Sequence, residues 1–431
     1  MAAAAANIEA IFMMGLLSGV DNRPTHVAFP KIREAEHDAA QHLIRYVAGM
    51  SHVASILYIF PIFDPEGADG WSRRAVRMMA TIGDRARHTI AADEYRGALP
   101  ADVRATLAQN PPPLTGAISV ARYEAIARAL RGHDLVLTHG AGAIDAAMAR
   151  RAFPRGAPPI VHHEDPAEAT MGGSARLYRR IALGAAGGLV VSGEAAAQAA
   201  QARWKLSADR VHAIPPGIDL AAFARGPDAK ATAGFRRKPT DVVIGIVADL
   251  AAGDDVALLV RAVAGVAARF RLVVIDAGGA ADAATGDGGG RAAVERAALA
   301  MGIDDRLVLR DTIPASSSYL GAFDVLLLPM RRGPAPAIVV EAMAAGVPVM
   351  ALGGGATEER LSAENRALLA PFAGEVAVRD ALQPLATDAT LRASIGAANR
   401  ARAMAVHGDA AMIERSVALY AAVTGRPGSL G

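Results

Sequence analysis

The residues that carry the most chemical information lie between Pro334 and Met350. This segment begins as a loop, continues as a short helix that carries Glu341, ends at Gly346 and enters a strand through Pro348. A helix that ends at glycine and is followed by Pro-Val-Met is typical of a doubly wound domain. We place Glu341 early in the helix, where carboxylates are favoured and where ligands often dock.

A glycine-rich loop follows this segment. Gly353, Gly354 and Gly355 come directly after the predicted strand 347–351. A helix N-terminus preceded by glycines can hold a diphosphate, because its backbone N–H groups and the helix dipole both face the anion. The loop therefore predicts a phosphate site at the carboxyl end of that strand.

Histidines follow two other predicted strands. His139 comes after 135–138, where it is either a hydrogen-bonded structural residue or a ligand contact. The run 162–165, His-His-Glu-Asp, contains metal-binding residue types, but adjacent histidines in a strand point to opposite faces of the sheet. We therefore expect no metal site there, with His162 in the core and His163 to Asp165 at the edge of a cleft.

The elements that must position these residues alternate between strands and helices, which predicts parallel sheets with right-handed crossovers. The first series has strands at 53–60, 88–92, 135–138, 159–162 and 188–191, and helices at 72–82, capped by Ser72, and 120–131. After a turn-rich connector at 214–219, the second series has strands at 242–247, 272–275, 307–309, 325–328 and 347–351. Asp409 caps a final helix at 410–423, and 282–290 is a surface loop.

This rhythm predicts two α/β domains, each with a doubly wound parallel sheet. We place them at residues 51–215 and 216–405, with an N-terminal extension at 1–50 and a C-terminal helix and tail at 406–431. Within the extension, 31–47 has helical spacing of apolar residues, so it either packs on the next domain or binds a partner.

Composition excludes several classes of protein. The 431 residues are 52% hydrophobic, carry a formal net charge of +2 and are only 4% aromatic, which is atypical of a nucleic-acid-binding surface. The absence of cysteine excludes disulfides and thiolate zinc sites and is compatible with the cytosol. The apolar run 11–17 is shorter than a membrane span, and the first residues lack a signal-peptide pattern. Attachment to a membrane surface stays open.

Several segments together resemble the retaining GT-B glycosyltransferases of family 4. Besides 334–350, the similar segments are 134–140, 161–165, 190–192, 214–219, 244–250 and 319–329, in the same order as in the family, so the resemblance spans about residues 53–425. It implies two Rossmann-like domains facing across a cleft, and metal-independent transfer of a sugar from a nucleotide-sugar to a polysaccharide or glycolipid acceptor. Nucleotide-sugar is then a co-substrate, and no cofactor is implied.

The resemblance also implies roles for single residues. Glu341 would hold the ribose hydroxyls of the nucleotide, and His139 would lie over the donor sugar as the catalytic-site histidine. Gly67 belongs to a loop that would cover the phosphates, together with Gly353 to Gly355 from the other domain. The location implied is cytoplasmic or peripheral to the inner face of the membrane.

The chain departs from the family at the phosphate positions. Asp249 and Asp254 stand where the family has an arginine and a lysine, and Gly333 replaces the first glutamate of its motif. Arg331 and Arg332 lie just before Gly333 and are candidates to supply the positive charge. Two alternatives therefore stay open beside an active transferase: a pseudo-glycosyltransferase that binds or scaffolds a protein partner, and a nucleotide or sugar-phosphate binder without chemistry.

Overall fold

The computed structural model describes residues 53–65, 70–166, 172–236, 238–250, 253–277, 289–313, 315–329, 337–351, 355–371 and 374–425. The predicted extension 1–50 and most of the predicted loop 282–290 lie outside the described residues. None of the described helices is both long enough and apolar enough to cross a membrane.

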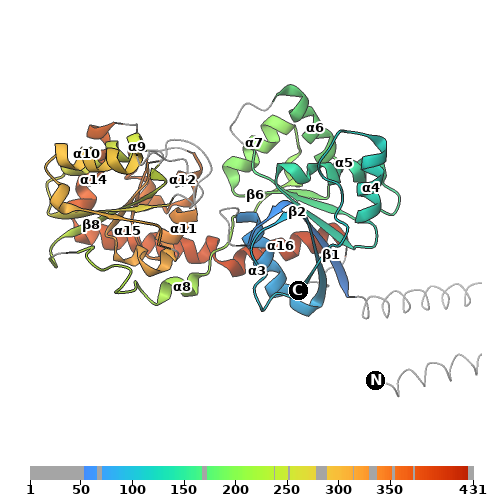
Figure 1. The fold of residues 1–431 in the computed structure, drawn as a ribbon, viewed down its shortest axis with the longest axis horizontal. Helices are drawn as coiled ribbons and strands as arrows, with labels where there is room; N and C mark the ends of the chain where they lie inside the picture. The colour runs from blue at the N-terminus through green and yellow to red at the C-terminus, as the bar shows by residue number, and fades with distance from the viewer. Residues whose placement is uncertain are drawn as a thin grey trace, which may run out of the picture. The chain divides into compact units, whose positions relative to one another are not determined.

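The first part of the chain forms a seven-stranded sheet in the order β3-β2-β1-β4-β5-β6-β7, and every pairing described in it is parallel (Figure 1). The strands are β1 Ala54–Phe63, β2 Ala86–Tyr95, β3 Ala105–Leu107, β4 Leu135–His139, β5 Ile160–His163, β6 Gly188–Val191 and β7 Val211–Ala213. The helices are α3 Gly70–Ile82, α4 Val120–Leu130, α5 Ile144–Ala152, α6 Gly173–Leu183 and α7 Glu194–Trp204.

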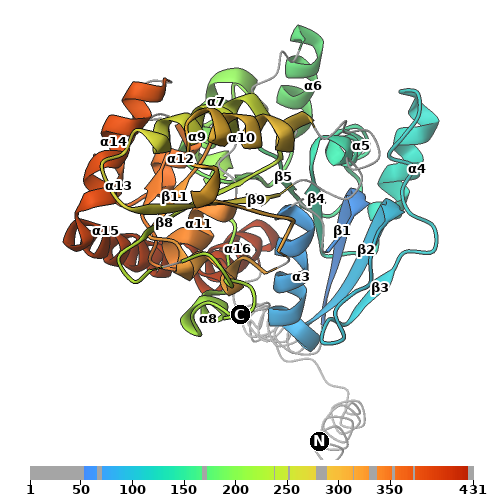
Figure 2. The same cartoon turned by 60° about the vertical axis from the view of Figure 1, so that its left-hand side comes forward.

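The second part forms a five-stranded parallel sheet in the order β10-β9-β8-β11-β12 (Figure 2). Its strands are β8 Val242–Ala248, β9 Phe270–Asp276, β10 Leu307–Arg310, β11 Val325–Leu327 and β12 Val349–Met350. The helices are α8 Leu220–Ala224, α9 Gly253–Ala264, α10 Gly289–Ala300, α11 Ala337–Ala344, α12 Gly355–Arg360, α13 Ala363–Arg366, α14 Glu375–Thr387, α15 Ala389–Arg402 and α16 Asp409–Thr424.

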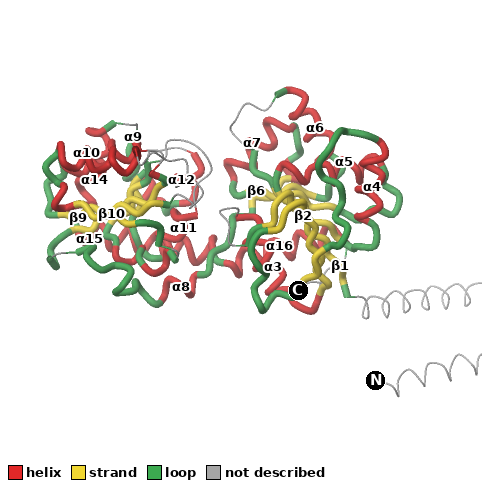
Figure 3. The backbone as a smooth tube through the Cα atoms, viewed as in Figure 1, coloured by secondary structure: helices red, strands yellow, loops and turns green. Residues whose placement is uncertain are grey.

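Both sheets are covered by helices on their two faces (Figure 3). In the seven-stranded sheet, α3 and α16 share one hydrophobic cluster with the strands, while α4 to α7 contribute to clusters on the opposite face. In the five-stranded sheet, α9, α10 and α14 cover one face, and α8 and α11 the other. The predicted α/β class with two doubly wound parallel sheets is therefore confirmed.

Each sheet has a topological switch point, where one strand is flanked on both sides by strands that come later in the chain. In the first sheet β1 pairs with both β2 and β4, and in the second β8 pairs with both β9 and β11. Ligands of open α/β sheets bind outside the carboxyl ends of the strands at such a switch point. His139 ends β4 and Asp249 follows β8, so two of the residues selected from the sequence lie at these switch points.

Local predictions failed where short-range signals competed with tertiary contacts. Ser72 is not the cap of α3, because the helix begins at Gly70 and the Ser72 hydroxyl accepts a hydrogen bond from the Asp64 N–H at 3.2 Å. Asp409 is likewise not a cap but the first residue of α16, and its carboxylate pairs with Arg77 at 2.7 Å. The three-residue strands β3 and β7 were missed, because so short a run carries no periodicity.

Candidate functional site

His139 is the last residue of β4 and is only 2% exposed. Its ring stacks on Phe60 of β1 at a centroid distance of 4.2 Å and on His163 of β5 at 4.4 Å. The Trp71 ring lies near the same stack, with its centroid 6.4 Å from that of His139 and 5.7 Å from that of His163. The predicted catalytic-site histidine is thus part of an aromatic cluster rather than an exposed strand-end residue.

The electrostatic state of His139 follows from this burial. Among the described residues neither ring nitrogen of His139 has a hydrogen-bond partner. Burial, followed by the nearby charges of Arg74 and His162, holds the pKa of His139 well below its usual value, so the ring is neutral near pH 7. A neutral imidazole can donate one hydrogen bond and accept another, which is the chemistry needed to bind a hydroxyl group.

The prediction for the residues after His162 is wrong in part. His162 is in the core as expected, but His163 and Glu164 are also buried, at 0% and 5% exposure, instead of lying at a cleft edge. Asp165 is half-buried, and its carboxylate accepts a hydrogen bond from the Ser192 N–H at 2.7 Å. The strand end is covered by packing that the sequence pattern does not specify.

Glu164 owes its burial to a bidentate pair with Arg179 of α6, at N–O distances between 2.8 and 3.1 Å. His162 also contacts the Glu164 carboxylate at 3.1 Å, and its other nitrogen contacts the Thr138 hydroxyl at 2.7 Å. Burial alone would raise the pKa of Glu164, but the hydrogen bonds and charges of His162 and Arg179 outweigh it, and the pKa is lowered. In the described part of the chain, no group of three or more histidines and carboxylates is arranged to hold a metal ion.

Arg74 of α3 is a buried charge that the sequence analysis did not select. It is 2% exposed and donates to the Ile214 carbonyl oxygen at 2.9 Å and to the Ser416 hydroxyl at 2.8 Å. Its guanidinium lies 5.7 Å from the Trp71 ring centroid. Nothing in the local sequence marks this arginine, because its partners are about 140 and 340 residues away.

Glu341 lies in α11, one of the helices that cover the five-stranded sheet. It is the fifth of the eight residues of α11, so it does not lie at the start of the helix as the sequence analysis expected. The side chain is half-buried, and burial together with the charge of Glu341 raises the pKa of the buried Tyr319. The charge of Glu341 therefore acts on Tyr319, in the segment before β11.

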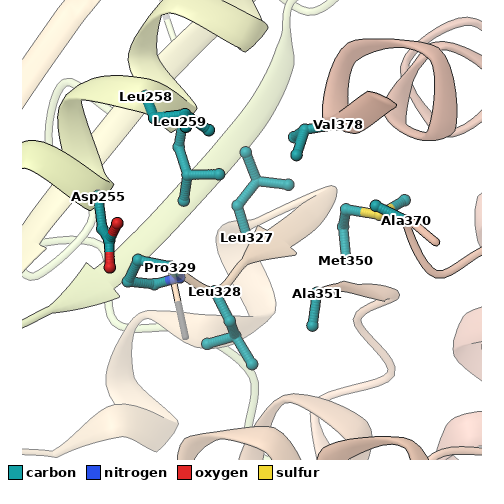
Figure 4. A pocket seen from close by; sticks show the side chains of 10 residues that line it. All are labelled: Asp255, Leu258, Leu259, Leu327, Leu328, Pro329, Met350, Ala351, Ala370 and Val378. Atoms are coloured by element: carbon teal, nitrogen blue, oxygen red, sulfur yellow. The ribbon is translucent and has the colours of Figure 1, made fainter. Parts of the chain in front are cut away.

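An apolar pocket lies at the switch point of the five-stranded sheet (Figure 4). Its volume is about 20 Å³, room for a water molecule but not for a sugar. The lining comes from the ends of β11 and β12 and from α9 and α14: Asp255, Leu258, Leu259, Leu327, Leu328, Pro329, Met350, Ala351, Ala370 and Val378. Asp255 is the one charged side chain among the described residues of this lining.

The two aspartates at the phosphate positions are exposed. Asp249 follows β8, and Asp254 lies in the first turn of α9, where a carboxylate interacts favourably with the helix dipole. Near α12 the described residues begin at Gly355, the first residue of that helix. Gly67, Arg331, Arg332, Gly333, Gly353 and Gly354 lie outside the described residues.

The helix that follows the glycine loop contacts the first sheet's helices. The Glu359 carboxylate accepts hydrogen bonds from the backbone N–H groups of Glu194 and Ala195, at the start of α7; the second is 2.9 Å long. A Cβ on Gly193 would lie 2.6 Å from a Glu359 oxygen, so a residue without a side chain suits this contact. Glu359 was not selected from the sequence. Its position shortly after the glycine-rich loop is the only local feature that could have pointed to this contact.

Comparisons with known proteins agree with this architecture. A family model described as "Glycosyltransferase Family 4" matches residues 69–222, and one described as "Glycosyl transferases group 1" matches residues 241–388. A D-inositol 3-phosphate glycosyltransferase of Xylanimonas cellulosilytica is 30% identical over 205 residues, which cover 45% of this chain and 47% of that protein. The chain thus spans about half the length of this curated relative.

Solved structures resemble the chain over a larger span. A glycosyltransferase from Rickettsia africae has a TM-score of 0.68 at 14% identity, covering 86% of this chain and 98% of that one. Anabaena HepE in complex with UDP has a TM-score of 0.66 at 15% identity, covering 85% and 100%. At these identities the likeness shows the fold, which is GT-B.

Proposed function

This chain belongs to the GT-B glycosyltransferases that the family 4 and group 1 models describe, and on that basis we propose that it transfers a sugar from a nucleotide-sugar to a polysaccharide or glycolipid acceptor, with retention at the anomeric carbon. The observation that carries the proposal is that each model matches one of the two sheets, in the order that the fold requires. We assign the acceptor to domain 51–215 and the donor to domain 216–405.

The donor site proposed here lies at the switch point of the five-stranded sheet. Glu341 would hold the ribose hydroxyls, which a half-buried carboxylate beside the strand ends can do by accepting two hydrogen bonds. Gly355 begins α12, so Gly353 to Gly355 would present the helix N-terminus to the diphosphate. Gly67 would cover the phosphates from the acceptor domain.

The donor we propose to test first is a uridine nucleotide, because Anabaena HepE, a structural neighbour, was solved with UDP and with UDP-glucose. The exposed acids Asp249 and Asp254 repel a diphosphate. Arg331 and Arg332 are then the residues that would supply the compensating charge. Stabilising the leaving diphosphate is an electrostatic task that preorganised charges and backbone N–H groups perform without a metal ion.

His139 would act on the sugar from the acceptor domain. Its neutral ring offers a donor and an acceptor, and neither nitrogen is engaged by another described residue.

We further propose a cytoplasmic protein, peripheral to the inner face of the membrane when the acceptor is a glycolipid.

The experiment that tests the function is calorimetric titration of the full chain with UDP, GDP and ADP and with their glucose conjugates, followed by a release assay for the nucleoside diphosphate. We expect micromolar binding of one nucleotide and turnover of its conjugate when a suitable acceptor is present. Glu341→Gln should weaken binding by about tenfold, because two hydrogen bonds to hydroxyls are lost or weakened.

The matched control is Glu375→Gln, which removes an exposed charge from α14 in the same domain and should leave binding unchanged. Binding without turnover for any acceptor would favour the nucleotide-binding alternative. Absence of binding across all the nucleotides would refute the transferase and favour the pseudo-glycosyltransferase, for which the two exposed acids are the supporting observation.

A further inference from the structure

Three neighbouring strands each contribute one ring to the stack that contains His139. Because Ile59 is opposite Thr138 in the parallel register, Phe60 follows opposite His139, and His139 is itself opposite His163. The three rings therefore stand side by side on one face of the sheet, with His139 in the middle. The centroid distances of 4.2 and 4.4 Å are close to the spacing of adjacent strands.

Within the described part of the chain, no hydrogen bond fixes the ring of His139. Both nitrogens lack a partner among the described residues, and the ring planes are inclined by only 4° to Phe60 and 21° to His163. The plane of the His139 ring is consequently set by the two rings that enclose it. Phe60 is held by packing alone, so the position of His163 decides how well the stack is defined.

His163 is held at both nitrogens. Nδ1 lies 3.1 Å from the Thr138 carbonyl oxygen, which can only accept, so Nδ1 carries the hydrogen. In the neutral ring Nε2 is then an acceptor, and the Tyr420 hydroxyl donates to it at 3.0 Å. The two partners together allow one tautomer and one ring orientation.

Tyr420 comes from the C-terminal helix α16, more than 250 residues after His163. It is 1% exposed, and one turn earlier the Ser416 hydroxyl accepts a hydrogen bond from Arg74 of α3 at 2.8 Å. Burial raises the pKa of Tyr420, so the phenol keeps its hydrogen. The helix that ends the described chain thus supplies the donor that locks His163.

We propose that Tyr420 is a positioning residue for His139: its hydroxyl fixes the ring of His163, the ring of His139 enclosed between His163 and Phe60 is thereby held in one plane, and a hydroxyl of the donor sugar is the partner that this buried ring would bind. The part concerning the sugar rests on the proposed function. The part concerning the two rings does not.

The test is Tyr420→Phe in the full chain, which removes one oxygen and keeps the ring. Tyr58→Phe is the matched control, because Tyr58 is also fully buried and its hydroxyl contacts another histidine, His88, at 3.1 Å. Nitrogen-15 NMR of the histidine rings reports the tautomers. We expect His163 to be the Nδ1–H tautomer in all three proteins, because the Thr138 carbonyl oxygen is retained, and the Nε2 resonance of His163 to move to that of an imidazole nitrogen without a hydrogen bond in Tyr420→Phe but not in Tyr58→Phe.

The second readout is the affinity for UDP and UDP-glucose, or for the nucleotide pair that the titrations identify. Tyr420→Phe should weaken binding of the conjugate by about fivefold, the size of one neutral hydrogen bond, and leave binding of the free nucleotide unchanged. A general structural defect would weaken the binding of both ligands equally, and that result would overturn the proposal. An unchanged Nε2 resonance of His163 in Tyr420→Phe would overturn it as well. If the wild type binds no conjugate, the proposed function fails, while the NMR result still decides whether Tyr420 fixes the two rings.

Discussion

The two switch points of the molecule are lined by different types of residue. In the seven-stranded sheet the strand ends carry buried polar groups: His139 without a hydrogen-bond partner among the described residues, His163 with two, and Glu164 in a bidentate ion pair. In the five-stranded sheet the strand ends form an apolar pocket, with exposed carboxylates around it at Asp249 and Asp254. The switch point of the seven-stranded sheet therefore has buried polar side chains. The switch point of the five-stranded sheet has buried apolar side chains and exposed carboxylates.

The histidines of the chain show the same division. Of the 11 histidines, His407 alone follows residue 212, so residues 216–405, which include the second sheet, contain none. Histidines that can respond to acid are therefore present in the first sheet and absent from the second. This contrast teaches that the two sites should respond differently to mutation and to acid, although both sheets have the same parallel architecture.

The largest effect is expected from Arg179→Met, which leaves the Glu164 carboxylate buried without its bidentate partner. Removing one member of a buried ion pair costs about 3–5 kcal/mol, and we expect the lower end here, since the Glu164 carboxylate keeps its contact with His162. Urea unfolding measures the loss. The exposed pair between Arg128 and Glu124 provides the control: Arg128→Met should cost less than about 0.5 kcal/mol. Equal losses for the two variants would contradict the importance of burial at Glu164.

In the second sheet's domain, stability should depend on close packing instead. A Cβ at Gly396 of α15 would lie 2.1 Å from the Gly346 carbonyl oxygen, and neither backbone can move easily. Gly396→Ala should therefore destabilise the protein by about 3 kcal/mol, as overpacking does, despite the better helix propensity of alanine. Gly173→Ala in α6 is the control, because a Cβ there has no neighbour within 4 Å among the described residues. A variant at position 396 that unfolds at the wild-type urea concentration would refute the close contact.

Acid should affect the first sheet before the second. Burial lowers the pKa of His139 and of His163 well below the usual value. Unfolded histidines bind protons near pH 6.5, so the stability that these neutral rings contribute is present above that pH and is lost as the pH falls below it. Each unit of lowered pKa corresponds to about 1.4 kcal/mol, or tenfold in the opening equilibrium. Hydrogen exchange between pH 7 and 5, corrected for intrinsic rates, should show β4 and β5 losing protection before β8 and β9. Simultaneous loss in both sheets would contradict this prediction.

The smallest effect is expected from charge reversal at the exposed aspartates beside the five-stranded sheet. Asp249→Arg with Asp254→Lys should strengthen UDP binding by about tenfold, because two exposed repulsive charges become attractive in a partly screened environment. Asp304→Arg with Asp305→Lys makes the same change of net charge just before β10, at the amino ends of the strands, and should have little effect. If both double variants strengthen binding equally, the gain reflects net charge and the two aspartates do not face the phosphates.

The sequence predicted most of the fold because the relevant signals are local. Buried parallel strands appear as continuous apolar runs, and the predicted strand 188–191 and the start of helix 120–131 agree with β6 and α4. Predicted strand 325–328 likewise agrees with β11 within one residue. The position of His139 at a strand end followed from the same pattern.

What the sequence by itself determined, then, is the order of strands and helices and which chemical groups stand at the strand ends, since both depend on residues that are neighbours in the chain. Tertiary structure alone decided that His163 and Glu164 are buried. It also decided that Arg179 pairs with Glu164 and that Tyr420 contacts the ring of His163. These partners are 15 and 257 residues away, and they meet only because helices pack on both faces of the sheet. Burial and pairing are set by such long-range packing, for which a single sequence holds no periodic signal.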